Sequence, residues 1–198
     1  MSAIQDKIFE FIYGAGLHDA TAQRAYPCHK GEEKQLKNNK EAVEIVKGYV
    51  DNIIKGTPDD FYDIAMRLVN SFNMFEKTNG MKELFTFGNA QKLINITVKF
   101  MYIVSYNNVE MQQLFANCHC PLDRKMGGFV KKELKKLRMY KSLPRDIVTI
   151  IDNNLWKKWD GTWSKVSVES YRQYQTVVMY LSKKEGVIPI EYDYIHFK

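Results

Sequence analysis

The chain has 198 residues, enough to bury a hydrophobic core without disulfides or metals as staples. Apolar residues make up 45% and charged residues 26%, which is typical of a globular protein and excludes a largely disordered one. The formal net charge is +6, and 23 lysines outnumber 6 arginines. Lysine suits point-charge contacts with phosphate better than the bidentate reading of bases.

The sequence predicts a cytoplasmic location. No run of about 18 uncharged apolar residues is present, so we expect no membrane span. The N-terminal residues include Asp6, Lys7 and Glu10, whereas a signal peptide has an unbroken apolar stretch. Three cysteines are an odd and small number for a disulfide framework, so we expect reduced thiols.

The beginning of the chain is predicted to form two helices. Apolar residues recur at helical spacing from Ile4 to Ile12, which predicts an opening helix that ends at Gly14 and Gly16. Asp19 is expected to cap a short helix that Pro27 stops.

Two clearer helices follow. Apolar residues from Ala42 to Ile54 line one face, and Gly56 takes the usual C-terminal position. Thr57-Pro58-Asp59-Asp60 is a start signal for a helix that continues to Phe75. Asn79-Gly80 then predicts a turn.

The segment 88–106 is apolar around most of a helical circumference, which predicts a central, buried helix. Its polar residues share one stripe, the polar stripe: Gln91, Lys92, Asn95, Lys99, Tyr102 and Tyr106. Burying Lys92 or Lys99 unpaired would cost several kcal/mol, roughly, so we expect the stripe to face water, an acidic partner or a cavity. We interpret it as a candidate pocket for an anionic ligand; the alternative is the exposed edge of an amphipathic helix.

Cys118-His119-Cys120 contains zinc-ligand side chains, and a zinc site is one interpretation. Its ligands would be Cys28, His29, Cys118 and Cys120. However, paired zinc cysteines usually have a gap of two to four residues, so we predict neither metal nor cofactor. The alternatives are a tight turn before a helix begun by Pro121, or a nucleophilic Cys120 whose pKa is lowered at that helix start.

Arg24-Ala25-Tyr26-Pro27-Cys28-His29 resembles the RxxxxH signature of the HEPN ribonucleases, which are small all-helical domains that dimerise to cleave RNA. The resemblance covers these six residues, and Pro27 interrupts a pair that lies at the start of a helix in that family. It implies acid–base chemistry by His29 and phosphate binding by Arg24.

Basic residues concentrate in the second half. Between Arg124 and Lys158 there are 11 basic residues and three acidic ones. A predicted helix from Phe129 to Tyr140 carries a basic face of Lys131, Lys132, Lys135, Lys136 and Arg138. With Trp156, Trp159 and Trp163 nearby, this face is a candidate nucleic-acid surface. The alternative is a solvated lysine-rich face.

The remaining segments complete a helical domain. Ser142-Leu143-Pro144 and Ser167 predict two more helix starts, and Gly186 ends the last helix. From Val187 to Lys198 apolar and acidic residues alternate, which predicts a docked, extended tail. We therefore predict a mainly α, single-domain helical bundle over residues 1–198, with about seven to nine helices and this extended C-terminal tail.

These features favour a non-enzymatic helical binding protein for an anionic ligand, either a nucleotide or a nucleic acid. One alternative is an RNA- or nucleotide-directed hydrolase that uses Arg24 with His29, or His119. Another is a protein-interaction module or inhibitor of a macromolecule that uses the aromatic tail. The sequence contains no P-loop, GxGxxG, HExxH, GxSxG or EF-hand motif, so no well-marked enzyme family is indicated.

Overall fold

The computed structural model describes residues 3–22, 26, 32–82, 84–140, 142–153 and 161–196. Within these ranges the chain folds into helices without a strand, so the prediction of a mainly α fold is confirmed. No helix in the described ranges has both the length and the apolar character needed to cross a bilayer.

The chain divides into two compact units, Met1–Phe115 (unit 1) and Ala116–Lys198 (unit 2). Each unit has its own buried apolar residues, such as Leu68 and Leu93 in unit 1 and Leu122 and Tyr171 in unit 2. The expectation that residues 1–198 form a single domain stays a prediction.

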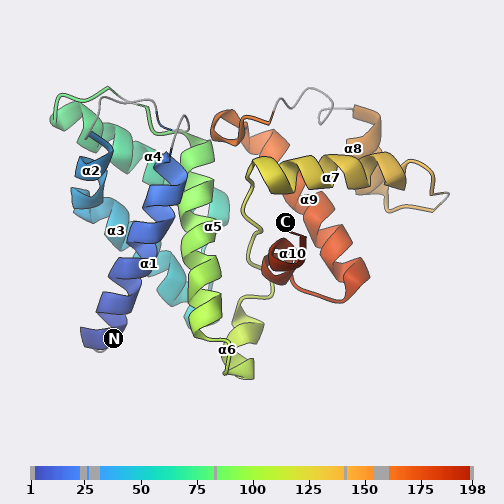
Figure 1. Cartoon of the computed structure of the whole chain (residues 1–198), viewed down its shortest axis with the longest axis horizontal. Coiled ribbons are helices and arrows are strands. Elements are labelled where there is room, and N and C mark those ends of the chain that lie inside the picture. The colour runs from blue at the N-terminus through green and yellow to red at the C-terminus, as the bar shows by residue number, and fades with distance from the viewer. Residues whose placement is uncertain are drawn as a thin grey trace. The chain divides into compact units, whose positions relative to one another are not determined.

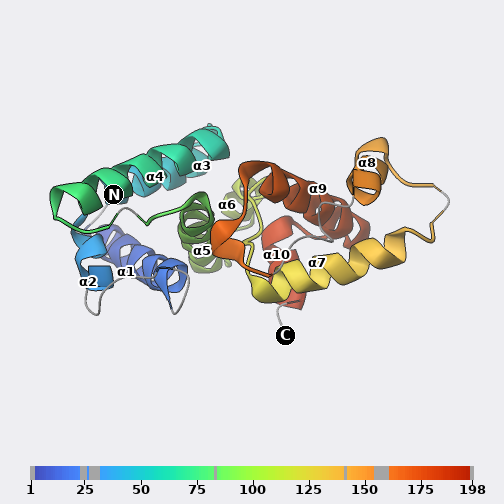
Figure 2. The ribbon, with the colours of Figure 1, turned by 90° about the horizontal axis from the view of Figure 1, so that it is seen from above.

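Unit 1 is built around two long helices, α1 and α5, which run antiparallel and side by side (Figure 1). A second layer of α3 and α4 packs against them (Figure 2). The helices are α1 (Ala3–Thr21), α2 (Glu32–Gln35), η2 (Leu36–Asn38), α3 (Lys40–Ile54), α4 (Phe61–Thr78), α5 (Phe87–Val104) and α6 (Val109–Leu114).

Helix α1 continues through both glycines at which its end was predicted. Gly14 is exposed, whereas Gly16 is buried against α5. A Cβ at Gly16 would lie 2.8 Å from Thr97 Oγ1 and 3.2 Å from the Leu93 carbonyl oxygen. The missing side chain therefore permits close packing of α1 on α5, and that packing offsets the low helix propensity of glycine. Asp19 consequently lies within α1 and caps no separate helix.

Helix α5 is central, as predicted, and its first nine residues are all buried. It begins with a reciprocal cap, in which the Thr86 hydroxyl accepts from the Asn89 N–H and Asn89 Oδ1 accepts from the Thr86 N–H. The Asn89 Nδ2 donates to the Ala20 carbonyl oxygen at 2.7 Å, near the end of α1. One side chain thus satisfies backbone groups at the ends of two helices.

Helices α3 and α4 match their predicted apolar faces, with Val46, Val50 and Leu68 fully buried or nearly so. Their caps are Asn39, which accepts from the Ala42 N–H, and Asp60, which accepts from the Tyr62 and Asp63 N–H groups. The start of α4 therefore lies after Asp60, beyond the expected Thr57-Pro58 position.

Unit 2 contains α7 (Arg124–Leu137), α8 (Arg145–Asn153), η4 (Trp163–Lys165), α9 (Val168–Glu185) and α10 (Pro189–His196). Both ribbon views place α10 beside α7 and α9 (Figures 1 and 2). The largest buried side chains of this unit are Tyr171, Tyr174, Tyr192, Leu122 and Met126.

The C-terminal segment is helix α10, so the prediction of an extended tail is wrong. Pro189 occupies the first helical position, where its missing N–H and fixed φ favour a helix. The buried residues are Pro189, Ile190, Tyr192 and Asp193. The three-residue spacings from Pro189 to Tyr192 and from Ile190 to Asp193 fit one broad side of a helix packed on α7 and α9. The alternation along the sequence does not follow burial, because Tyr194 is exposed and Asp193 is buried.

Candidate functional site

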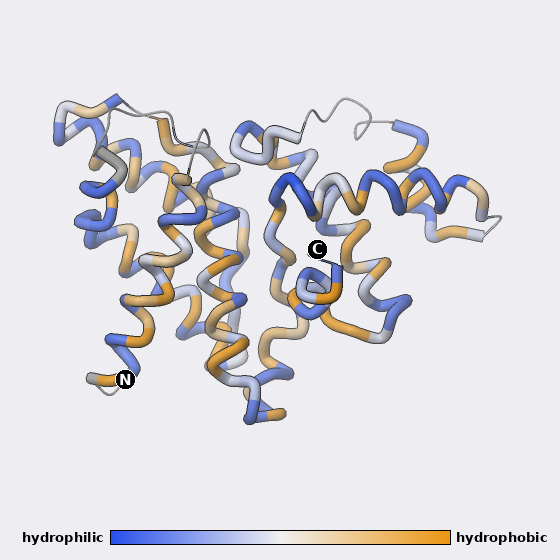
Figure 3. Tube along the Cα trace, in the orientation of Figure 1, coloured by the Kyte–Doolittle hydropathy of each residue, from blue (hydrophilic) through white to orange (hydrophobic). Residues whose placement is uncertain are grey.

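The basic face predicted from the sequence lies on α7. Asp123 caps this helix by accepting from the Met126 N–H at 2.8 Å. The side turned to the interior of unit 2 consists of Met126, Val130, Leu134 and Leu137. Among the residues expected on the basic face, Lys131 is half-buried, and the exposed ones are Lys132, Lys135, Lys136 and Arg138. Along α7 hydrophilic and hydrophobic stretches alternate, as expected for a helix with one buried face (Figure 3).

Positive charge dominates this part of the molecule. Unit 2 has 16 lysines and arginines against 9 aspartates and glutamates, a net charge of +7, while unit 1 has 13 against 14, a net charge of −1. Within α7 the one acidic residue is Glu133, whose Oε1 lies 2.6 Å from Lys136 Nζ. Because this ion pair is exposed at its lysine, it is weak and leaves the ammonium accessible to an anion.

A hollow of about 460 Å³ adjoins the C-terminal end of α7. Its lining residues are Arg138, Tyr140, Leu143, Val148, Ile151 and Asp152. The Arg138 Nη2 donates to the Ile151 carbonyl oxygen at 3.4 Å, which connects the end of α7 to α8. The Arg138 guanidinium thus borders both the basic face and the hollow.

Tyr140 was not among the expected site residues. Its side chain is 54% exposed, and Lys184 Nζ of α9 lies 4.5 Å from the centre of its ring. An exposed aromatic ring beside a cation can stack with a nucleobase. The sequence signal was an aromatic residue two positions after a run of lysines and Arg138; the contact with Lys184 requires the tertiary fold.

The polar stripe of α5 begins in the interior of unit 1. Gln91, Lys92 and Asn95 are buried, and the Asn95 Nδ2 donates to Gln91 Oε1 at 3.2 Å. Lys92 Nζ lies 3.0 Å from Asp19 Oδ2 of α1, so a carboxylate of the chain itself already pairs with this ammonium. Its burial is compatible with charge because Asp19 supplies the opposite sign.

The other members of the polar stripe have separate environments. Tyr102 is buried, and its hydroxyl accepts from the Gln112 Nε2 at 3.3 Å. Lys99 is half-buried, whereas Tyr106 lies beyond the end of α5 and is exposed. The stripe therefore runs from the interior of unit 1 to its surface.

Cys118, His119 and Cys120 pack against α9 within unit 2. Gln175 holds the Cys120 backbone from both sides: its Oε1 accepts from the N–H at 3.1 Å, and its Nε2 donates to the carbonyl oxygen at 2.6 Å. The Cys120 Sγ lies 3.1 Å from the Tyr174 hydroxyl, and His119 Nδ1 lies 3.2 Å from the Tyr171 hydroxyl. These contacts fix the turn that leads into α7.

This geometry does not favour cysteine chemistry. Helix α7 begins at Arg124, so Cys120 is not at the helix start that was expected at Pro121, and it is fully buried. Burial raises the pKa of Cys118 to about 12, which keeps that thiol uncharged near neutral pH. Burial also raises the pKa of Tyr174 well above its usual range.

Several candidate residues lie outside the described residues. These are Arg24 and His29 of the HEPN-like signature, Cys28 of the zinc alternative, and Trp156 and Trp159. Trp163 lies in η4 and is half-buried. In the ranges that the structure describes, no three His, Cys, Asp or Glu side chains are grouped to hold a metal ion.

Comparison of the chain with protein-family models, with curated proteins and with solved structures found no match. No family is assigned. The function is therefore argued from the residues of the chain itself, above all from the basic face of α7 and the adjoining hollow.

Proposed function

We propose that this is a non-enzymatic, cytoplasmic binding protein that holds the phosphate backbone of a nucleic acid on the basic face of α7. The observation that carries the proposal is the exposure of Lys132, Lys135, Lys136 and Arg138 along one helix of a unit with a net charge of +7. Such a field attracts polyanions and increases their association rate.

The chemistry of the basic face supports backbone contacts over base reading. Three of its four exposed cations are lysines, which act as point charges, and the single arginine is partly engaged by the Ile151 carbonyl. The exposed ring of Tyr140 adds a sequence-tolerant surface on which an unpaired base can stack. We therefore propose a single-stranded nucleic acid as the preferred ligand, bound with little sequence specificity.

The burial of Gln91, Lys92 and Asn95 argues against the nucleotide pocket that the sequence indicated. Lys92 is paired with Asp19, and Gln91 and Asn95 bond to one another. A small anion at this place would have to compete with a carboxylate of the protein itself. Of the two ligands that the sequence indicated, we therefore propose the nucleic acid and not the nucleotide.

The test is a salt titration of binding to a fluorescently labelled single-stranded RNA, measured by anisotropy on the full chain. The affinity is expected to fall linearly with salt on logarithmic axes, with a slope of about −0.9 per phosphate neutralised for a duplex and about −0.7 for a single strand. The triple variant Lys132→Gln, Lys135→Gln and Lys136→Gln is expected to weaken binding and to reduce the slope by about 2.

A matched control removes three exposed lysines of unit 1, with the substitutions Lys37→Gln, Lys55→Gln and Lys77→Gln. Both triple variants lose the same total charge, so only a local contact distinguishes them. Equal losses in both variants, or no binding by the unmodified chain at low salt, would contradict the proposal. A Tyr140→Ala variant that loses affinity for single strands but not for duplexes would support the stacking role.

A further inference from the structure

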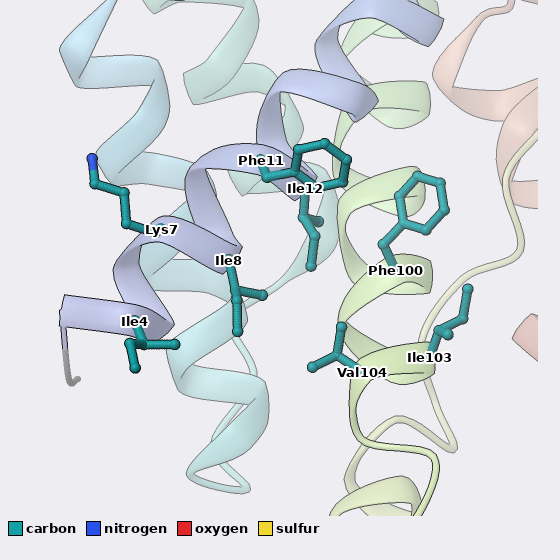
Figure 4. Close-up of a pocket in the computed structure, with 8 residues that line it drawn as sticks. All are labelled: Ile4, Lys7, Ile8, Phe11, Ile12, Phe100, Ile103 and Val104. Atoms are coloured by element: carbon teal, nitrogen blue, oxygen red, sulfur yellow. The ribbon is translucent and has the colours of Figure 1, made fainter.

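Unit 1 has an apolar groove between α1 and α5, far along both helices from the Asn89 cap. Its volume is about 630 Å³. The residues that line it come from one face of each helix: Ile4, Lys7, Ile8, Phe11, Ile12, Phe100, Ile103 and Val104. Figure 4 shows the apolar side chains of the two helices on either side of the hollow.

The walls of the groove are exposed to an unusual degree for such side chains. Phe11 is 79% exposed and Ile4 is 73% exposed, and on α5 the exposed apolar residues are Phe100, Ile103 and Val104. Single exposed apolar residues are ordinary, but a contiguous patch on two adjacent helices marks an interaction surface. Covering this patch is therefore favourable for whatever occupies it.

Charge around the groove is balanced. Lys7 Nζ lies 2.7 Å from Glu10 Oε2, and Asp6 Oδ1 lies 2.8 Å from Lys47 Nζ. In Figure 4 the amine of Lys7 points away from Phe100 and Val104 on the opposite wall. A partner selected by charge would find little to recognise at this rim.

We infer that the groove is the interface of a symmetric dimer, and that its occupant is the same surface of a second copy of this chain. A two-fold interface pairs a surface with itself, so every charge meets its own sign near the axis. An apolar groove with a neutralised rim, on a unit with a net charge of only −1, satisfies this condition. The basic unit 2, with a net charge of +7, is unsuited to such self-association.

The shape of the surface also fits a second copy. Ile4, Ile8 and Phe11 follow the four- and three-residue spacing that packs one helix against another. In a symmetric pair the exposed Ile4 and Phe11 of each chain cover the groove of the other. Phe11 alone contributes on the order of 150 Å² or more per chain, toward the roughly 800 Å² per partner of a typical stable interface.

Sedimentation equilibrium of the full chain over a wide concentration range tests the inference. The unmodified chain is expected to shift from 23.2 kDa toward twice that mass as its concentration rises. Phe11→Ser and Val104→Ser, which change exposed residues on separate helices, are each expected to weaken dimerisation at least about tenfold. The effect of each substitution is doubled because a two-fold interface contains it twice.

Met139→Ser is the matched control, because Met139 is also 79% exposed but belongs to unit 2. It is expected to dimerise like the unmodified chain, and circular dichroism checks that all variants fold. Dimerisation through the apolar groove is also expected to persist at high salt, whereas binding of phosphate by the basic face is expected to be lost there. A chain that stays at 23.2 kDa at every concentration, or a dimer unaffected by both groove variants, would overturn the inference.

Discussion

Lys92 and Asp19 link the two central helices of unit 1 through an ion pair of 3.0 Å, in which the lysine is buried and the aspartate is half-exposed. The side chain of Lys92 is 6% exposed and that of Asp19 is 49% exposed. Removing the carboxylate leaves an ammonium in the interior, whereas removing the ammonium leaves a carboxylate that water can reach. The two partners of this pair are therefore energetically unequal.

We expect Asp19→Asn to destabilise unit 1 by about 1 to 2 kcal/mol, a value reduced from that of a fully buried pair because Asp19 is half-exposed. Lys92→Met is expected to cost less, because it strands no buried charge and keeps the packing of the side chain. Denaturant unfolding followed by far-ultraviolet circular dichroism measures both. A larger loss for Lys92→Met than for Asp19→Asn would contradict this expectation and would mean that Lys92 makes stabilising contacts besides the one with Asp19.

The Asp19→Asn variant also tests whether the two units unfold as a single cooperative domain. All three tryptophans, Trp156, Trp159 and Trp163, belong to unit 2, so tryptophan fluorescence reports on that unit alone. Because each unit has its own core, we expect Asp19→Asn to shift the dichroism transition and to leave the fluorescence transition in place. If both signals shift together, the two units unfold as the one domain that the sequence predicts.

Gly16 and Gly14 provide a matched pair of substitutions in one helix. Gly16→Ala places a Cβ 2.8 Å from Thr97 Oγ1 and 3.2 Å from the Leu93 carbonyl oxygen. The Thr97 hydroxyl must then leave its bond to the Leu93 carbonyl, or α1 and α5 must move apart by a few tenths of an ångström. We expect a loss of about 1 to 3 kcal/mol. Gly14→Ala meets no atom within 4 Å and is expected to gain about 0.5 to 1 kcal/mol from helix propensity. Thermal unfolding distinguishes the two; equal effects would mean that α1 does not approach α5 closely at Gly16.

The buried Cys118 thiol is expected to resist alkylation in the folded chain. Burial raises its pKa from 9.0 to about 12, and the thiolate is the reactive form. At pH 8 this difference alone makes alkylation on the order of a thousandfold slower than in the unfolded chain. Iodoacetamide labelling with mass spectrometry of the Cys118 peptide, in buffer and in guanidinium, measures the ratio.

The same pKa shift fixes the direction of a pH effect. The folded state keeps the Cys118 proton up to about pH 12, while the unfolded state releases it above pH 9. With respect to this thiol, the free energy of unfolding is therefore at its full value below pH 9 and falls as the pH rises toward 12. Rapid labelling of Cys118 at pH 8 without unfolding would show that its thiol is accessible and its pKa ordinary.

Much of the fold could be predicted because its signals are local. The apolar spacing of α3 and α4 and the all-round apolar character of α5 need only neighbouring residues. The continuation of α1 through Gly16 could not, because the compensating contact comes from Leu93 and Thr97, far along the chain. Helix α10 was not predicted because the alternation of apolar and acidic residues is typical of a strand, although Pro189 is also typical of a helix start.

The candidate site divides in the same way. The basic face of α7 could be predicted from the sequence. On a helix, Val130 and Leu134 lie on one side and the run of lysines on the other, so the buried and exposed sides are clear. The partner of Lys92 could not be predicted, because Asp19 lies on another helix and nothing in its local sequence marks it. The apolar groove could not be predicted either. Phe11 and Phe100 are residue types that usually lie in a core, and only the structure shows that they are exposed.

The amide of Asn89 has a mechanical consequence for the long antiparallel pair. It ties the last turn of α1, through the Ala20 carbonyl, to the first turn of α5, and the close contact at Gly16 lies just beyond. Toward Ile4 the two helices are separated by the hollow of the groove. Helix α1 is thus tied to α5 near its C-terminal end and to α3 near its start, through the ion pair of Asp6 with Lys47. Local opening of α1 is therefore expected at its exposed first turn and is expected to stop before the buried Phe9 and Ile12.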